Sequence, residues 1–151
     1  MKTRFPARLY SVWIMRYVDL PPKERKKFPG SNLPVKGNCN GVPFRGTLVA
    51  RAGGGLRVAI NARVRKAAGG VDVGDKVVIT LEKANAHPMP RLPRELTDLL
   101  AGLPGGRLAW EERARGWRRQ VLLWLTQSKD PDVRTRRARQ VVRRLGYSSE
   151  K

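Results

Sequence analysis

The sequence predicts an α+β fold that is mainly β in its first part and helical in its last part. Six segments rich in β-branched and aromatic residues lie between residues 4 and 81, separated by turns rich in glycine or asparagine. From residue 94 onward, apolar residues recur at helical spacing. We therefore expect a small β-barrel domain over residues 1–86, a proline-broken linker over 87–93 and a helical region over 94–151.

The charge is the unusual feature of the composition. The 151 residues include 32 Lys and Arg against 12 Asp and Glu, a formal net charge of +20. The excess is spread along the chain, which attracts polyanions, chiefly nucleic acid; compositional drift is the alternative explanation. Cys39 is the single cysteine, so an intramolecular disulfide is excluded. The sequence shows no signal peptide and no membrane span, so we expect a cytoplasmic protein.

The first four expected strands form two pairs. Residues 4–10 and 12–18 make the first pair, in which we expect Trp13 to be buried in the core. Residues 33–36 and 43–50 make the second, joined around Asn38-Cys39-Asn40-Gly41, in which Asn-Gly is the strongest short hairpin signal.

The pattern of residues 53–83 predicts a strand, a short helix, a turn and a second strand, in that order. The strands are 56–60 and 77–81, and Asn61 is a good N-cap for a helix over 62–68. Arg65 in this helix could hold a phosphate or carboxylate. Alternatively, it ties the helix to an acid of the barrel such as Asp75.

Helices are expected at residues 94–101, at 108–113, after Gly116 and from Pro131, the last with Asp130 as its N-cap. The third should pack through one face, made of Trp117, Val121, Trp124, Leu125 and Ser128. His87 is expected to be a mobile linker residue.

The last helix should have an apolar face and a basic face. The apolar stripe consists of Ala138, Val141, Val142 and Leu145. The opposite face carries Arg136, Arg139 and Arg143, flanked by Arg137 and Arg144. Arg134 falls within the apolar stripe and therefore needs an acidic partner. The acids expected to supply it are Glu111, Glu112 or Asp132.

Four short motifs carry a resemblance to a known family. They are residues 41–48 (GVPFRGTL), 60–61 (IN), 64–67 (VRKA) and 73–75 (VGD) with Val77. The segment resembles the bacterial domain of unknown function that usually precedes the YdeI/OmpD-associated (bacteriocin-protection) domain. This resemblance implies a closed, six-stranded, double-split β-barrel. A more distant similarity to the swapped hairpin of AbrB-like DNA-binding proteins hints at a homodimer.

The C-terminal segment WLTQSKDPDVRTRRARQVVRRL is similar to the YdeI/OmpD-associated motif itself. The residues that correspond to the family's tryptophan, lysine and arginines are Trp124, Lys129, Arg134 and Arg137. Val133 stands where a threonine is usual. The resemblance implies no settled biochemical activity.

Two functional hypotheses follow from these observations. The first is a non-enzymatic protein that binds DNA or RNA through phosphate contacts with little sequence specificity. Its expected contacts are Arg136, Arg137, Arg139, Arg143, Arg144, Arg63, Lys66, Lys26 and Lys27. The second is a stress or bacteriocin-protection module that binds a small anionic ligand or a protein. Its expected contacts are Lys129, Arg134, Arg137 and Arg65. No catalytic residues, metal ligands or cofactors are expected.

Overall fold

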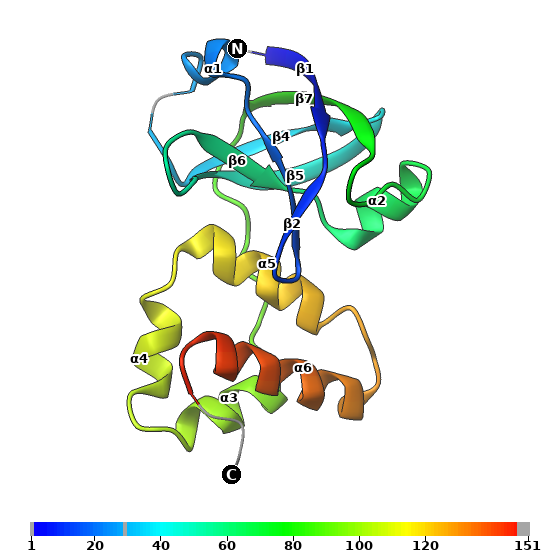
Figure 1. Cartoon of the computed structure of the whole chain (residues 1–151). Coiled ribbons are helices and arrows are strands. Elements are labelled where there is room, and N and C mark those ends of the chain that lie inside the picture. The colour runs from blue at the N-terminus through cyan, green and yellow to red at the C-terminus, as the bar shows by residue number, and fades with distance from the viewer. Residues whose placement is uncertain (1, 29, 148–151) are drawn as a thin grey trace. The chain divides into compact units, whose positions relative to one another are not determined.

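The computed structural model describes residues 2–28 and 30–147 (Figure 1). The chain divides into two compact units, Met1–Pro88 and Met89–Lys151. Among the described residues, those of the first unit form the strands and two short helices, and those of the second unit form four further helices.

The first unit is built on a seven-stranded antiparallel sheet that curls into a half-barrel (Figure 1). Its strands are β1 (Lys2–Arg8), β2 (Tyr10–Val12), β3 (Met15–Asp19), β4 (Leu33–Cys39), β5 (Val42–Ala50), β6 (Leu56–Ala59) and β7 (Lys76–Lys83). Their order in the sheet is β1-β7-β4-β5-β6-β3-β2. Leu9 alone separates β1 from β2, which stand at opposite ends of that order, so the sheet has to curl to bring its two ends together.

The expected number of six strands was wrong because residues 12–18 do not form one strand. Val12 pairs with Met15, and the chain reverses at Trp13 and Ile14 between β2 and β3. Trp13 has a φ of 55°, a left-handed conformation that is rare for a bulky residue. Its side chain is only half-buried, so its expected place in the core was also wrong. The turn contains no glycine, asparagine or aspartate that would reveal it in the sequence.

The predicted hairpin around Asn40-Gly41 and the predicted N-cap at Asn61 are confirmed. The β4–β5 hairpin turns at Asn40 and Gly41, both with positive φ, as a two-residue turn with the right twist requires. Helix α2 (Ala62–Ala67) begins at Asn61, whose side chain accepts a hydrogen bond from the Val64 amide at 3.0 Å. Val64 in turn contributes to the hydrophobic core beneath the sheet. Burial of this helix face therefore fixes α2 against the curled sheet.

One glycine of β4 is required by a close approach of two backbones. A Cβ atom on Gly37 would lie 1.7 Å from the carbonyl oxygen of Thr80 in β7. Beside it, the Asn38 amide donates to Oγ1 of Thr80 at 2.9 Å. The strands thus pack too closely here for any side chain at position 37.

His87 belongs to the sheet unit, so its assignment to a mobile linker was wrong. The residue is 4% exposed. Its Nε2 lies 2.9 Å from the Val35 carbonyl oxygen and 3.0 Å from that of Gly46. Because both partners are acceptors, Nε2 carries the proton and donates to them. The imidazole thereby joins the end of the unit to strands β4 and β5.

The second unit packs four helices around a small apolar core. They are α3 (Arg94–Ala101), α4 (Gly106–Glu111), α5 (Arg115–Leu125) and α6 (Pro131–Arg144). The buried residues include Leu96, Leu100, Trp110, Val121, Leu122, Leu125, Ala138, Val141 and Val142. Asp130 caps α6 as expected, since its side chain accepts from the Asp132 amide at 2.9 Å. The expected packing face of α5 was only partly right, because Leu122 is buried whereas Trp117 and Trp124 are half-buried.

Candidate anion-binding surfaces

Helix α6 presents an exposed row of arginines. Arg136, Arg139 and Arg143 are all exposed, opposite the buried side chains of Ala138 and Val141. Within the described residues, none of the three arginine side chains has a hydrogen bond or an ion pair. Spacings of three and four residues place them along one side of the helix. We call these three residues the α6 arginine row.

The remaining α6 arginines are engaged within the protein. The Nη1 atom of Arg137 donates to the Trp124 carbonyl oxygen at 2.8 Å and to Oε1 of Gln127 at 3.2 Å. Its guanidinium also lies 5.0 Å from the centre of the Trp124 ring. The carbonyl oxygen of Arg144 accepts from Arg113 at 2.9 Å. Arg137 therefore holds the end of α5, and its capacity for an external ligand is reduced.

Arg134 has the acidic partner that its position requires, but not one of the three expected acids. Its Nε and Nη2 donate to the two carboxylate oxygens of Glu95, each at 3.2 Å. Its Nη1 donates to the Ser128 carbonyl oxygen at 3.1 Å. Glu95 lies on α3, which packs against α6, and 39 residues separate the partners. The hydrogen bonds from Arg134 lower the pKa of the Glu95 carboxyl.

We predict that Arg134→Ala lowers the free energy of unfolding by about 1 kcal/mol, because the charge-assisted pair is mostly shielded from solvent. The pKa of Glu95 is lower in the folded state, so its stabilisation is present above the unfolded pKa and disappears as pH falls through the folded pKa. Urea unfolding at several pH values should show the variant's deficit shrinking in acid. The control Arg136→Ala should unfold like the wild type, and an equally stable Arg134→Ala would contradict the pairing.

Lys129 is the third residue of the group expected to bind a small ligand. It is exposed in the segment between α5 and α6 and makes no side-chain hydrogen bond or ion pair within the described residues. Arg134 and Arg137, by contrast, fasten that same segment through the Ser128 carbonyl oxygen and the Gln127 side-chain oxygen. Of the four expected ligand contacts, Arg134 and Arg137 are thus occupied within the protein.

Of the two alternatives for Arg65, an external anion or an internal acid, the structure shows the internal ion pair. The acid is Asp72 and not the expected Asp75. The Nη1 atom of Arg65 lies 3.2 Å from Oδ2 of Asp72 rather than near Asp75, and its Nε donates to the Ile60 carbonyl oxygen at 3.2 Å. Asp72 also accepts from Nε of Arg16 at 2.7 Å. The hydrogen bond from Arg16 is the main cause that lowers the pKa of Asp72. Burial lowers the pKa of Arg65.

Most of the expected nucleic-acid contacts outside α6 are exposed and could bind a phosphate. Arg63 and Lys66 on α2 are exposed, as is Lys26, which follows the short helix α1 (Pro22–Arg25). Lys27 forms an ion pair with Glu24 at 2.9 Å. Glu24 also accepts from the Thr3 hydroxyl, and this hydrogen bond is the main cause that lowers its pKa.

The structure shows a basic surface that local sequence patterns did not identify. Four neighbouring strands, β1, β7, β4 and β5, expose cationic side chains on one face of the sheet. We call this surface the basic sheet face. Its members are Lys2, Arg4 and Arg8 of β1, Lys76 of β7, Lys36 of β4 and Arg45 of β5.

Strand register places these residues together. Lys2 stands opposite Glu82, Glu82 opposite Lys36, and Lys36 opposite Arg45, which makes one row across the four strands. Residues directly opposite on antiparallel strands point to the same side. Glu82 is the acid in this row and pairs with Lys2 at 3.7 Å.

Two pairs on the basic sheet face oppose like charges. Lys36 faces Arg45, and Arg8 faces Lys76. Like charges in directly opposite positions destabilise a sheet. Arg8 donates to the Gly74 carbonyl oxygen at 2.7 Å, whereas the other three make no side-chain hydrogen bond or ion pair within the described residues. A bound polyanion would remove this repulsion.

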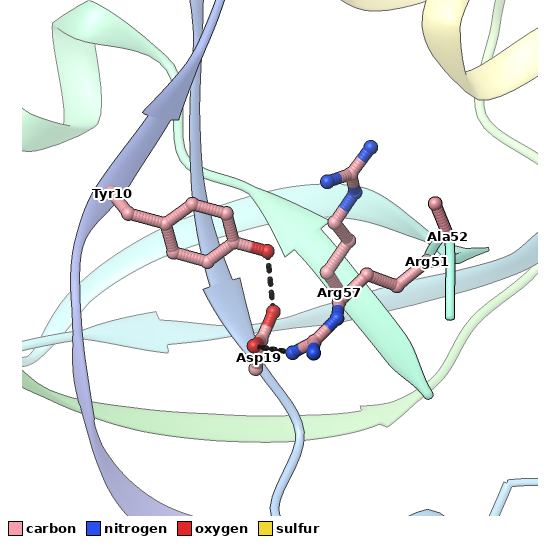
Figure 2. A pocket seen from close by; sticks show the side chains of 5 residues that line it. All are labelled: Tyr10, Asp19, Arg51, Ala52 and Arg57. Carbon is pink, nitrogen blue, oxygen red and sulfur yellow. Dashed lines mark hydrogen bonds and ion pairs between the residues drawn. The ribbon is translucent and has the colours of Figure 1, made fainter. Parts of the chain in front are cut away.

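A small open pocket of about 310 Å³ lies elsewhere on the sheet unit (Figure 2). Its lining residues are Tyr10, Asp19, Arg51, Ala52 and Arg57. Asp19 accepts from the Tyr10 hydroxyl through one oxygen and from Arg51 through the other. Figure 2 shows the Arg51 guanidinium directed at Asp19 and that of Arg57 directed away from it.

Comparisons with known proteins agree with this architecture. Residues 6–81 match the domain of unknown function DUF1905, and residues 90–146 match the family described as bacteriocin-protection, YdeI or OmpD-associated. The chain belongs to the DUF1905 family, and its DUF1905 domain is followed by a YdeI/OmpD-associated domain, as the sequence motifs predicted. No curated protein matches the sequence significantly.

Two kinds of feature are absent from the described residues. None of the helices they form is long and apolar enough to cross a membrane. Among the same residues, no three His, Cys, Asp or Glu side chains gather as they would around a metal ion.

Proposed function

We propose that this protein binds nucleic acid through the phosphate backbone and catalyses no reaction. The observation that carries the proposal is the like-charge register of the basic sheet face, where Lys36 opposes Arg45 and Arg8 opposes Lys76. Such pairs reduce the stability of the free protein, and a phosphate placed between two cations converts the repulsion into attraction.

The α6 arginine row adds a second cationic surface to the other unit. Arg136, Arg139 and Arg143 are exposed and free of acidic partners within the described residues. Each phosphate that a cation neutralises releases condensed counterions, and this release drives binding at low salt. Arg143 lies seven residues after Arg136, a rise of about 10 Å at roughly 1.5 Å per residue, so the row can contact more than one phosphate of a strand.

The proposed binding has little sequence specificity. Phosphate contacts set the position and orientation of a protein on nucleic acid, whereas base contacts read the sequence. The exposed cations lie on a sheet face and in a helical row, and neither surface suggests a set of side chains that reads one base. We therefore expect similar affinity for different duplex sequences.

The alternative of a small-ligand or protein-binding module on Lys129, Arg134, Arg137 and Arg65 has less support. Arg134 already pairs with Glu95, and Arg65 already pairs with Asp72. Arg137 is held by the carbonyl oxygen of Trp124. A ligand would have to displace these internal partners, whereas the basic sheet face and the α6 arginine row need no such exchange.

A direct titration tests the proposal. Labelled duplex DNA, single-stranded DNA and single-stranded RNA are titrated with the protein near 100 mM salt and followed by fluorescence anisotropy. We expect saturable binding that weakens steeply as salt is raised. Scrambling the sequence of the probe should leave the affinity unchanged. Absence of binding to all three probes near 100 mM salt would contradict the proposed function.

We also propose that the curled sheet closes into the double-split barrel that the family resemblance implies. The link through Leu9, which is 1% exposed, supports it, because this residue connects strands from opposite ends of the sheet order. Closure predicts that the β2 amides are protected from hydrogen exchange about as well as those of β4. Rapid exchange along β2 would contradict closure.

A further inference from the structure

We propose that the pocket lined by Tyr10, Asp19, Arg51, Ala52 and Arg57 binds a small organic molecule through one singly charged oxyanion, a carboxylate or a phosphodiester. In this proposal Arg57 is the charge partner of the oxyanion. The apolar body of the ligand lies against the ring of Tyr10 and the methyl group of Ala52. This site is separate from the basic sheet face and does not depend on nucleic-acid binding.

The charges of the pocket leave Arg57 without an acid. Register places Arg57 on β6 directly opposite Asp19 on β3. Both carboxylate oxygens of Asp19 are nevertheless occupied, one by the Tyr10 hydroxyl and the other by Arg51. Arg51 and Asp19 neutralise each other, so the pocket retains about one positive charge, and that charge is on Arg57.

Arg57 is also partly withdrawn from water. Its side chain is half-buried, and its guanidinium carbon lies 4.0 Å from the centre of the Tyr17 ring. Its Nε atom is buried and has no hydrogen-bond partner among the described residues. Buried donors normally have an acceptor, and a cation held against an aromatic ring is prepared for an anion without further ordering. An oxyanion entering the pocket supplies the counter-charge that this guanidinium lacks.

The neighbouring tyrosine helps to keep this arrangement fixed. Burial raises the pKa of Tyr10, its hydrogen bond to Asp19 raises it further, and the neighbouring Arg57 opposes this rise without reversing it. The hydroxyl therefore stays protonated and continues to donate to Asp19 at neutral pH. Because Tyr10 and Arg51 together hold Asp19, the carboxylate is not free to swing across to Arg57 (Figure 2).

Size limits the ligand to a small molecule. A volume of about 310 Å³ is at the lower end of the range for organic ligand sites, which begins near 300 Å³. It admits one ring with one charged group, and a base-paired duplex does not enter a space of this size. The two sources of the shared chemistry, a carboxylic acid and a phosphodiester, are separated by experiment.

The test is a titration followed by nuclear magnetic resonance, using benzoate for the carboxylate and methyl phenyl phosphate, which also has one ring and one charge, for the phosphodiester. We expect at least one probe to shift the Arg57 Nε–H signal saturably, with a Kd at or below about 1 mM. The Arg57→Gln variant lacks that signal, so its binding is followed through the backbone amide signals of Tyr10 and Ala52, which line the pocket, and its affinity should fall at least tenfold. The control Arg91→Gln, which removes the same charge from an exposed position outside the pocket, should keep it.

Arg57→Gln could also disturb the sheet, because Arg57 covers Tyr17. A second variant, Ala52→Trp, addresses this by filling the pocket from an exposed turn. It should abolish probe binding while the rest of the spectrum remains unchanged. The proposal is overturned if neither probe shifts the Arg57 signal saturably in the wild type, or if the shift persists in Ala52→Trp. A labelled duplex titrated in parallel should bind both variants normally, which separates this site from the proposed function.

Discussion

Replacing Arg45 and Lys76 by glutamate should stabilise the protein and at the same time weaken its binding to nucleic acid. Each change converts a like-charge pair of the basic sheet face into an opposite-charge pair, Lys36 with Glu at position 45 and Arg8 with Glu at position 76. An opposite-charge cross-strand pair contributes roughly 0.2–1 kcal/mol relative to a neutral pair. The midpoint of urea unfolding should therefore rise.

The same double variant removes two phosphate-binding cations and adds two negative charges. We expect the affinity for duplex DNA near 100 mM salt to fall by about tenfold or more. The matched control is Arg91→Glu with Arg107→Glu, which changes the net charge equally at exposed positions outside the basic sheet face. If the two double variants lose affinity equally, only the overall charge matters and the basic sheet face is not a binding surface.

Gly37→Ala should be the most damaging small substitution in the sheet unit. The new methyl group would lie 1.7 Å from the Thr80 carbonyl oxygen, a backbone atom that cannot move without shifting β7. Overpacking of this kind costs about 3 kcal/mol or more when no side chain can yield. We expect a lower unfolding midpoint and loss of protection at the Asn38 amide, whose acceptor is Thr80.

Gly102→Ala is the control for this substitution. Gly102 ends α3 with a negative φ, and an added Cβ would lie 3.8 Å from its nearest neighbours, an ordinary contact. The free energy of unfolding of Gly102→Ala should stay within about 0.5 kcal/mol of the wild-type value. Wild-type stability of Gly37→Ala would show that β4 and β7 are not as close as described.

Features set by neighbouring residues could be predicted from the sequence. The Asn40-Gly41 turn requires positive φ at both positions, and those residue types tolerate it. The caps of α2 and α6 depend on side chains two or three residues from the amides that they accept from. The family motifs likewise identified both domains, although the resemblance implied six strands and the sheet has seven.

Features set by contacts between distant segments could not be predicted in the same way. Glu95 and Arg134 meet because α3 packs on α6, and three acids closer to Arg134 in the sequence were expected instead. The buried His87 ring donates to carbonyl oxygens of two strands far earlier in the chain. The reversal at Trp13 has no turn residue to mark it.

The basic sheet face was missed for a related reason. Its six cations come from four strands, and their alignment depends on register, which the hydrophobic pattern sets for a whole strand at once. Knowing the order β1-β7-β4-β5 is what brings Lys2, Lys36 and Arg45 into one row. The α6 arginine row, by contrast, was predicted, because helical spacing alone determines which residues share a side.

The most direct test of phosphate-driven binding is the salt dependence of the affinity for duplex DNA. The logarithm of the association constant is plotted against the logarithm of salt concentration for the wild type and for a variant with Arg136, Arg139 and Arg143 changed to glutamine. Three lost phosphate contacts should make the slope shallower by about 2.7, at 0.9 per phosphate. An unchanged slope, or a wild-type slope near zero, would contradict the account.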